Sequence, residues 1–330
     1  MEKRLDPLDL RLLDEWQRDF PLCARPFLVV AQELGCSEEE VVDRLEKLRS
    51  SGRISRVGGT CTPNSISAST LAAVAAPQER LAETAEIIGR FEGVNHSYQR
   101  ENFWNLWFVA TGPDRKHVEQ TLAQIGMETG LRVLDLPLVR PFNVDLGFSL
   151  KKTKAHRVAR KAVQMDVLQE GDRDILQVLT GGMPICETPY QKVASQLGRS
   201  ETDILARIKA LLSAGIISRL GVIVRHRPLG WSSNAMVVWD VDAGNVEAAG
   251  KALAGTSGVT LCYERRPVPG VWPYRLYCMI HARSRSEAGE ILNRARELPQ
   301  LNGVSHEVLF SCHCYKQTGA LISVGREVAA

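Results

Sequence analysis

The sequence predicts an α+β protein that is a tandem duplication of one structural plan. Nine residues of the first half recur 163 positions later, beginning with the pair Asp9 and Asp172 and ending with the pair Gly58 and Gly221. A constant offset over about fifty residues indicates a fused duplication. The two copies would form a dimer within one chain, and fusion allows each copy to acquire a different role.

The composition is that of a globular protein. The chain has 330 residues, of which 44% are hydrophobic and 24% charged, and this length fits more than one domain. The net charge of +3 does not by itself indicate a nucleic-acid partner. The N-terminus lacks the apolar stretch of a secretion signal, and no window has the ~20 apolar residues of a membrane span. We therefore expect a cytoplasmic protein.

The cysteines predict neither a metal centre nor a disulfide framework. The chain has 8 cysteines and no CxxC pair, so reduced thiols are favoured. Cys312, His313 and Cys314 could hold a metal ion, but consecutive residues of a strand point to opposite faces. We predict no metal site.

Each copy begins with a pattern typical of a winged helix-turn-helix. In the first copy, Ser37 followed by Glu40 is a capping-box signal at the start of the third helix. Positions 172–224 repeat the plan. Three helices and the first wing strand are expected at 9–15, 27–34, 37–49 and 53–58. The predicted helix-turn-helix domains span 1–60 and 166–226.

The second part of each copy predicts the order strand, helix, strand, strand, helix, strand. This order is the ferredoxin-like βαββαβ unit, and 234–311 repeats it. The expected elements of the first copy are 69–75, 80–91, 93–100, 106–111, 115–130 and 131–138. The predicted ferredoxin-like domains span 61–150 and 227–330. The basic segment 151–165 is interpreted as a solvated linker, with a functional basic arm as the alternative.

A helix-turn-helix joined to a ferredoxin-like domain resembles the plan of the Lrp/AsnC transcription regulators. Helices that approach phosphates generally carry basic or amide side chains. The third helix of the first copy instead carries five acidic residues against Arg44 and Lys47, and that of the second copy is about neutral. DNA binding is therefore disfavoured, and the helices are expected to serve packing and dimer formation.

One face of each predicted sheet is rich in His, Tyr and Arg. Residues i, i+2 and i+4 of a strand share a face. The sets that share a face are His96, Tyr98 and Arg100, then Leu261, Tyr263 and Arg265, then Arg275, Tyr277, Met279 and His281. Neighbouring aromatic residues suit a large flat ligand, and guanidinium groups bind carboxylates. The alternative is a sheet face turned to water or to a dimer partner.

Both halves contain short motifs of aromatic, basic and histidine residues. In the first half they are His96-Ser-Tyr98-Gln-Arg100 and Asn105-Leu-Trp107-Phe. In the second half they are Arg225-His226, Asn234-Ala-Met-Val-Val-Trp239, Cys262-Tyr263-Glu-Arg265, Trp272-Pro-Tyr274 and Cys-Met-Ile-His281. These motifs closely resemble those of the siroheme decarboxylases, in the order expected of the fused two-subunit form. That family has the Lrp/AsnC architecture without its regulatory role.

The resemblance implies a carboxy-lyase whose substrate is siroheme. The acetate side chains at C12 and C18 would lose CO2 to give 12,18-didecarboxysiroheme, for d1 haem synthesis or for haem by an alternative route. It implies no cofactor, because the iron belongs to the substrate. The implied catalytic residues are His281, His226 and His96, with His281 or His226 as the acid. The implied substrate-binding residues are Arg265, Arg100, Tyr263, Tyr98, Trp272, Tyr274, Arg275, Asn234 and Trp107.

Three positions depart from the family pattern. The family commonly has His where this chain has Leu261 and Asn102, and Asn where it has Arg275. The first half keeps His96 and the second keeps His281, so we predict that one of two pseudo-equivalent pockets is competent and favour the second-half set. Two rival functions use the same pocket, a ligand-responsive DNA-binding regulator and a haem carrier. Whether the fused chain also forms a homodimer is left open.

Overall fold

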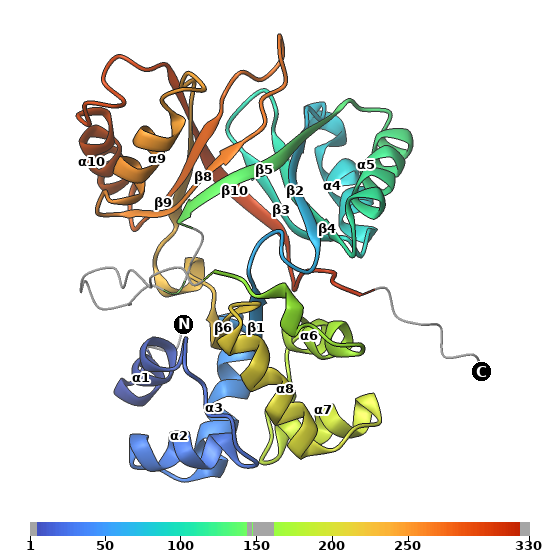
Figure 1. Ribbon diagram of the computed structural model, residues 1–330. Helices are drawn as coiled ribbons and strands as arrows, with labels where there is room; N and C mark the ends of the chain where they lie inside the picture. The colour runs from blue at the N-terminus through green and yellow to red at the C-terminus, as the bar shows by residue number, and fades with distance from the viewer. Residues whose placement is uncertain (1–4, 144–146, 148–161, 324–330) are drawn as a thin grey trace. The chain divides into compact units, whose positions relative to one another are not determined.

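The computed structural model describes residues 5–143, 147 and 162–323, so residues 151–161 of the predicted linker lie outside the described residues. The chain divides into two compact units, and each combines a part of the first half with the matching part of the second. We call them the winged-helix unit and the barrel unit (Figure 1). Among the described residues, no helix is both long and apolar enough to cross a membrane.

In the described residues, the winged-helix unit contains three α-helices and one strand from each half, and a short 3-10 helix from the second half. Its elements are α1 (Pro7–Glu15), α2 (Pro26–Leu34), α3 (Glu38–Ser50), β1 (Ile54–Cys61), the 3-10 helix η2 (Met165–Val167), α6 (Asp172–Gly181), α7 (Pro189–Leu197), α8 (Glu201–Ser213) and β6 (Ile217–Val224). The predicted cap is confirmed, since the Ser37 hydroxyl accepts a hydrogen bond from the Glu40 amide at 3.1 Å. Ser200 caps α8 in the same way.

The two copies join through an antiparallel pair of strands, β1 and β6. Gly58 lies directly opposite Gly221, at the centre of the pairing. A Cβ atom at position 221 would lie 2.5 Å from the Trp16 carbonyl oxygen, and one at position 58 would overlap the Leu179 carbonyl. These glycines recur because backbone from a neighbouring segment packs against the ribbon at both positions. The copies therefore form the expected dimer within one chain.

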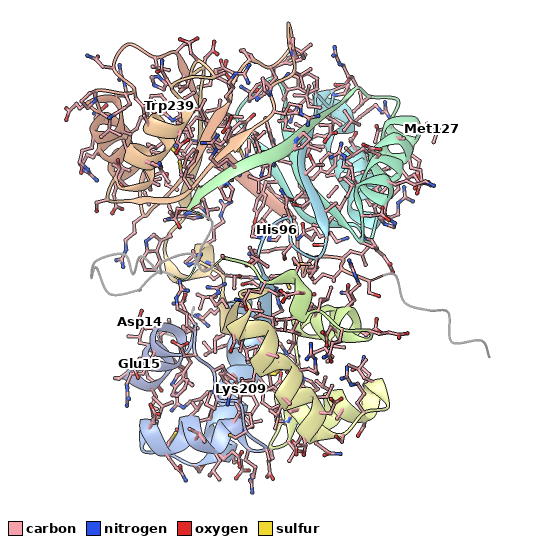
Figure 2. The ribbon with its side chains drawn as sticks, viewed as in Figure 1. Asp14, Glu15, His96, Met127, Lys209 and Trp239 are labelled. Carbon is pink, nitrogen blue, oxygen red and sulfur yellow. The ribbon has the colours of Figure 1, made fainter. Side chains whose placement is uncertain are left out.

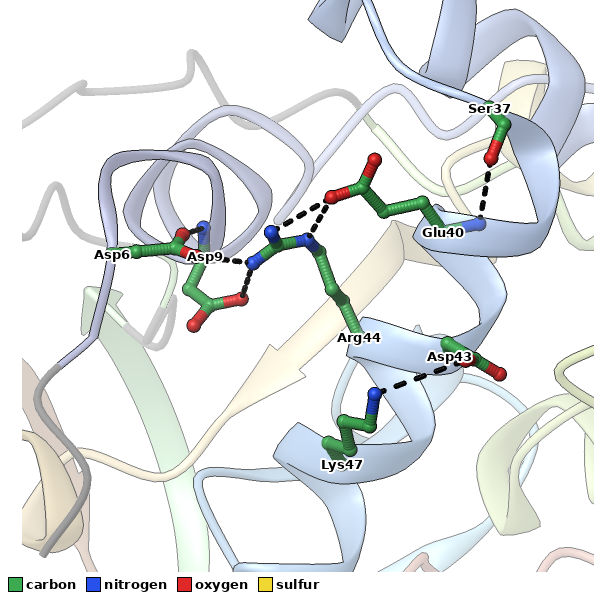
Figure 3. A network of polar contacts seen from close by, with 7 residues as sticks. All are labelled: Asp6, Asp9, Ser37, Glu40, Asp43, Arg44 and Lys47. Atoms are coloured by element: carbon green, nitrogen blue, oxygen red, sulfur yellow. Dashed lines mark hydrogen bonds and ion pairs between the residues drawn. The ribbon is translucent and has the colours of Figure 1, made fainter.

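The third helix of each copy has its central arginine bound within the unit. Arg44 of α3 contacts carboxylates of Asp6 at 2.6 Å, Glu40 at 2.8 Å and Asp9 at 2.9 Å (Figure 3). The hydrogen bond to Asp6 is the main cause that raises the pKa of Arg44. Arg207 of α8 makes the equivalent contact with Asp172 at 2.7 Å. The acidic residues thus neutralise both arginines.

The barrel unit contains the two βαββαβ repeats. The first repeat has β2 (Ala68–Val74), the 3-10 helix η1 (Gln78–Arg80), α4 (Leu81–Arg90), β3 (Val94–Arg100), β4 (Leu106–Gly112), α5 (Arg115–Thr129) and β5 (Val133–Asn143). The second has the 3-10 helix η3 (Arg227–Leu229), β7 (Ser233–Trp239), α9 (Val246–Ala254), β8 (Val259–Arg265), β9 (Leu276–Ala282), α10 (Arg285–Arg296) and β10 (His306–Gln317). The α+β tandem fold is confirmed.

The eight strands close into one barrel, in the order β10, β3, β4, β2, β5, β8, β9, β7. The last strand of each repeat runs from its own sheet into the other: β5 pairs first with β2 and then with β8, and β10 pairs with β7 and then with β3. The predicted end of β5 at Leu138 was therefore too early. The extension to Asn143 is stabilised by strand β8 of the other half, which local patterning does not reveal.

The strands of the barrel contribute side chains to two hydrophobic cores, one on each face of the sheet. Helices α9 and α10 cover one side of the barrel, and α4 and α5 cover the opposite side (Figure 1). Cys278 and Ile280 of β9 belong to the core under α9 and α10, which also contains Trp239, stacked on His306 at 4.7 Å. Tyr277 and Met279 belong to a second core with aromatic residues of both repeats. Figure 2 shows Trp239 on the helix-covered side of the second repeat.

Candidate active site

Two buried arginines occupy equivalent positions at the ends of β3 and β8. Arg100 is 7% exposed and Arg265 is 9% exposed. Each reaches a backbone carbonyl of the other repeat, since Arg100 Nη1 donates to Leu309 O at 3.2 Å and Arg265 Nη1 donates to Leu136 O at 2.7 Å. Burial is the main cause that lowers the pKa of both guanidinium groups.

Neither arginine has a carboxylate partner within the described ranges, and the Nε atom of each is buried without a hydrogen bond there. A buried charge normally requires a paired charge, because desolvation costs several kcal/mol. Arginine binds carboxylates through two parallel hydrogen bonds. Arg100 and Arg265 are therefore suited to an anionic ligand that brings its own carboxylates.

Tyrosine rings lie next to both guanidinium groups. The Arg100 guanidinium carbon is 5.6 Å from the centre of the Tyr98 ring, and that of Arg265 is 4.7 Å from the centre of the Tyr263 ring. Both contacts have cation–π geometry. Tyr98 and Tyr263 are half-buried, so the rings are partly accessible while they shield the arginines from water.

The predicted aromatic residues divide into accessible and buried ones. Trp107 and Trp272 are 1% and 3% exposed, and their rings pack 5.2 Å apart in the barrel core. Their burial fits a packing role that supports the site. Tyr274 is half-buried against Trp272 at 4.8 Å, and burial, together with a hydrogen bond to Glu307, raises its pKa to about 12.

His281 lies among side chains from both repeats. Its ring centre is 5.6 Å from that of His226, and its Nδ1 is 2.6 Å from the Thr260 hydroxyl. Burial lowers the pKa of His281 to about 4, and the positive charge of Arg100 contributes in the same direction. At neutral pH the ligand-free protein therefore carries a neutral His281.

The remaining predicted residues take different positions. Asn234 lies directly opposite His281 on β7, and its Oδ1 is buried without a hydrogen-bond partner in the described part of the chain. His96 stacks on Tyr98, with ring centres 6.3 Å apart. Arg275 is half-buried before β9, and its carbonyl accepts a hydrogen bond from the Arg265 amide at 2.8 Å.

The favoured second-half set lies next to an arginine of the first half. Arg100, from the first half, lowers the pKa of His281 and lies 4.0 Å from the sulfur of Met279, two residues before it on the same face. Because the barrel closes between the repeats, the histidine of one half faces the arginine of the other. Sequence reasoning also missed Thr260, whose contact with His281 carries no motif.

No metal centre is found among the described residues, where no group of three or more His, Cys, Asp or Glu side chains is placed to hold an ion. Two surface hollows, of about 340 Å³ and 430 Å³, are lined by other residues. Residues of α5 and β5 line the first, and residues 62–65 together with Ala162, Val163 and Met165 line the second. The arginine, tyrosine and histidine set remains the candidate site because of its chemistry.

Two family models match the chain, each in both halves. The AsnC-like ligand binding domain matches residues 66–143 and 228–316, and the siroheme decarboxylase NirDL-like HTH domain matches 9–54 and 172–217. The siroheme decarboxylase NirDL subunit of Paracoccus pantotrophus is 52% identical over 99% of both chains. The chain belongs to the siroheme decarboxylase family. It is accordingly an enzyme, a decarboxylase.

Other members of the siroheme decarboxylase family agree with this duplicated architecture. The siroheme decarboxylase NirD subunit of Stutzerimonas stutzeri is 49% identical over 44% of this chain and 96% of its own length, so a separate subunit corresponds to about one half. The crystal structure of the siroheme decarboxylase NirDL in complex with an iron-uroporphyrin III analogue matches with a TM-score of 0.68. That match has 25% identity and covers 96% of this chain and 94% of the other.

Proposed function

We propose that the enzyme decarboxylates siroheme, converting the C12 and C18 acetate groups to methyl groups and yielding 12,18-didecarboxysiroheme for d1 haem synthesis. The observation that carries this proposal is the pair of buried arginines without carboxylate partners among the described residues. Siroheme is a flat macrocycle with many carboxylates. It therefore supplies the carboxylate partners that Arg100 and Arg265 do not have among the described residues.

The reaction requires a proton at the carbon that loses CO2. The bond between the methylene carbon and the carboxylate breaks, its electron pair stays on the methylene carbon and the conjugated ring, and a proton then converts that carbon to methyl. His281 is the proposed donor. Burial is the main cause that lowers the pKa of His281, and the charge of Arg100 adds to it. A substrate carboxylate near Arg100 would offset this second contribution and so shift the pKa of His281 upward, towards the protonated form.

The other residues of the proposal bind and orient the substrate. Arg100 and Arg265 bind carboxylates, each contributing about 1.5 to 3 kcal/mol, and Tyr98 and Tyr263 cover the ring plane. His226 is proposed to hold the substrate beside His281, and His96 and Asn234 to contact its edge. The protein supplies no cofactor in this proposal, because the iron enters with the substrate.

The rival function, a ligand-responsive regulator that binds DNA, is disfavoured by the third helices. Arg44 and Arg207 are already bound to carboxylates, so contact with phosphate would require breaking these ion pairs. A haem carrier would share the pocket without turnover.

The test is anaerobic incubation of the purified chain with siroheme, followed by mass analysis of the extracted pigment. We expect a product lighter by two CO2 units. Pigment that binds and is recovered intact would favour the carrier. DNA retardation that decreases steeply with salt would favour the regulator.

A further inference from the structure

Thr260 is the extra residue of a β-bulge beside His281. On the pairing of β8 with β9, Val259 lies opposite Ile280 and Leu261 lies opposite Met279, so Thr260 has no opposite residue. Such bulges redirect a side chain and are common next to active sites. The Asn143 side chain of the first half donates to the Thr260 carbonyl at 2.9 Å, which connects the bulge to the other repeat.

The hydroxyl of Thr260 lies within hydrogen-bonding distance of two groups but has one proton to donate. Its oxygen lies 3.1 Å from the Met279 carbonyl oxygen and 2.6 Å from His281 Nδ1. A carbonyl can only accept, whereas a ring nitrogen of neutral histidine either donates or accepts. Both contacts are hydrogen bonds only if Thr260 donates to Met279 O and accepts from His281 Nδ1–H.

We propose that Thr260 is a positioning residue that holds neutral His281 in the tautomer with the proton on Nδ1, so that Nε2 carries the lone pair and meets the substrate. This inference rests on the proposed function for its catalytic meaning, although the tautomer itself can be measured without substrate. Side chains from four segments surround this imidazole: Arg100 of β3, His226 before η3, Asn234 of β7 and Thr260 of β8.

The tautomer determines the path of the proton. Nε2 takes up a second proton and His281 becomes an imidazolium. The first proton stays on Nδ1, which continues to donate its hydrogen bond to the Thr260 hydroxyl oxygen. When the carbon–carboxylate bond breaks and CO2 leaves, the electron pair remaining on the methylene carbon takes the proton from Nε2. His281 returns to the Nδ1–H neutral form, ready for the second acetate, and one proton is consumed for each CO2 released.

The first repeat supplies a matched control. It has the same bulge, since Val94 lies opposite Ala110 and His96 opposite Val109. The equivalents of Thr260 and His281 are Asn95 and Thr111, and the Thr111 hydroxyl donates to Gly93 O at 3.0 Å. Thr111→Val therefore removes a threonine hydroxyl from the equivalent sheet of the first repeat and leaves the contact between Thr260 and His281 in place.

The test begins with the full chain, labelled with ¹⁵N-histidine and free of substrate. Pyrrole-like and pyridine-like ring nitrogens have different chemical shifts, and a His281→Gln variant assigns the His281 signals by difference. We expect a protonated Nδ1 in the wild type and in Thr111→Val, a loss of this preference in Thr260→Val, and its restoration in Thr260→Ser. A protonated Nε2 in the wild type, or an unchanged tautomer in Thr260→Val, would overturn the proposal.

Turnover is the second readout. The free energy of one neutral hydrogen bond corresponds to a factor of roughly 2 to 12 in a rate or equilibrium constant. Thr260→Val should therefore lower kcat by this factor, with little change in KM. Thr260→Ser should recover kcat, and Thr111→Val should retain it. A changed tautomer with unchanged kcat would refute the positioning role. If the wild type releases no CO2, the proposed function fails, whereas the NMR result still decides the tautomer.

Discussion

The two repeats of the barrel keep the same arginine and differ at the residue that we propose as the proton donor. Arg100 and Arg265 end equivalent strands and bond equivalent carbonyls of the opposite repeat. The position of His281 on β9, however, corresponds to Thr111 on β4, as the pairing of each strand with its neighbour shows. The comparison suggests that carboxylate binding was retained twice and proton transfer once, so the symmetric fold holds an asymmetric site.

The largest expected effect is that of removing the histidine. His281→Ala should lower the rate of CO2 release by about 10² to 10⁴, the usual contribution of a positioned general acid. Thr111→Ala, the matched change in the first repeat, should leave the rate within about twofold, well below that contribution. Single-turnover assays with saturating siroheme measure both variants. A His281→Ala variant with normal turnover would eliminate His281 as the acid.

The arginines should behave alike in binding. Arg100→Ala and Arg265→Ala should each weaken siroheme binding by about 10- to 150-fold, because each removes a charge-assisted contact of about 1.5 to 3 kcal/mol. Absorbance titration under anaerobic conditions measures the dissociation constants. Unchanged affinity in Arg265→Ala would mean that the carboxylates bind elsewhere and that the symmetry of the pair has no role in the reaction.

The next largest expected effect is on the stability of the protein in acid, and it comes from the second repeat alone. The pKa of His281 is lowered to about 4 in the folded protein, so the unfolded chain binds a proton first as pH falls below about 6.5 and stability decreases. His281→Gln should remove about 2 kcal/mol of the stability loss between pH 7 and pH 5. Denaturant unfolding at both pH values measures the difference. An equal loss in wild type and variant would contradict the lowered pKa.

The smallest expected effect is on the titration of His281 in Arg100→Ala. Because the charge of Arg100 contributes to the lowering after burial, its removal should raise the pKa of His281 by less than about one pH unit. Arg265→Ala should raise it less. NMR titration of the ring signals tests the order, and a larger rise in Arg265→Ala would reverse our assignment of which arginine faces the histidine.

Local features of the fold were predictable and nonlocal ones were not. The helix cap at Ser37, the recurring Gly58 and Gly221, and the shared face of Tyr277 and Met279 follow from residue spacing and the two-residue period of a strand. The extension of β5 to Asn143 depends on a strand about 120 residues later in the sequence, so neither turn signals nor hydrophobic alternation indicate it.

The candidate site shows the same limit. Motifs identified His281, His226, Arg100 and Arg265, but not which arginine lies near which histidine, because that depends on how the barrel closes. Burial also changed the interpretation of Trp107 and Trp272, which pack in the core. A motif specifies the residue type, whereas the share of its surface left for a ligand depends on its neighbours in three dimensions.

The crossing of β5 and β10 into each other's sheets has a consequence for assembly. If the halves were separate chains, identical copies would compete with unlike ones for the same strand partners. Only part of the population would then combine the half that has His281 with the half that has Thr111 at the equivalent position. Covalent fusion gives the unlike partner a high effective concentration. Every folded chain therefore contains one half of each kind, and the cell does not have to balance the synthesis of two subunits.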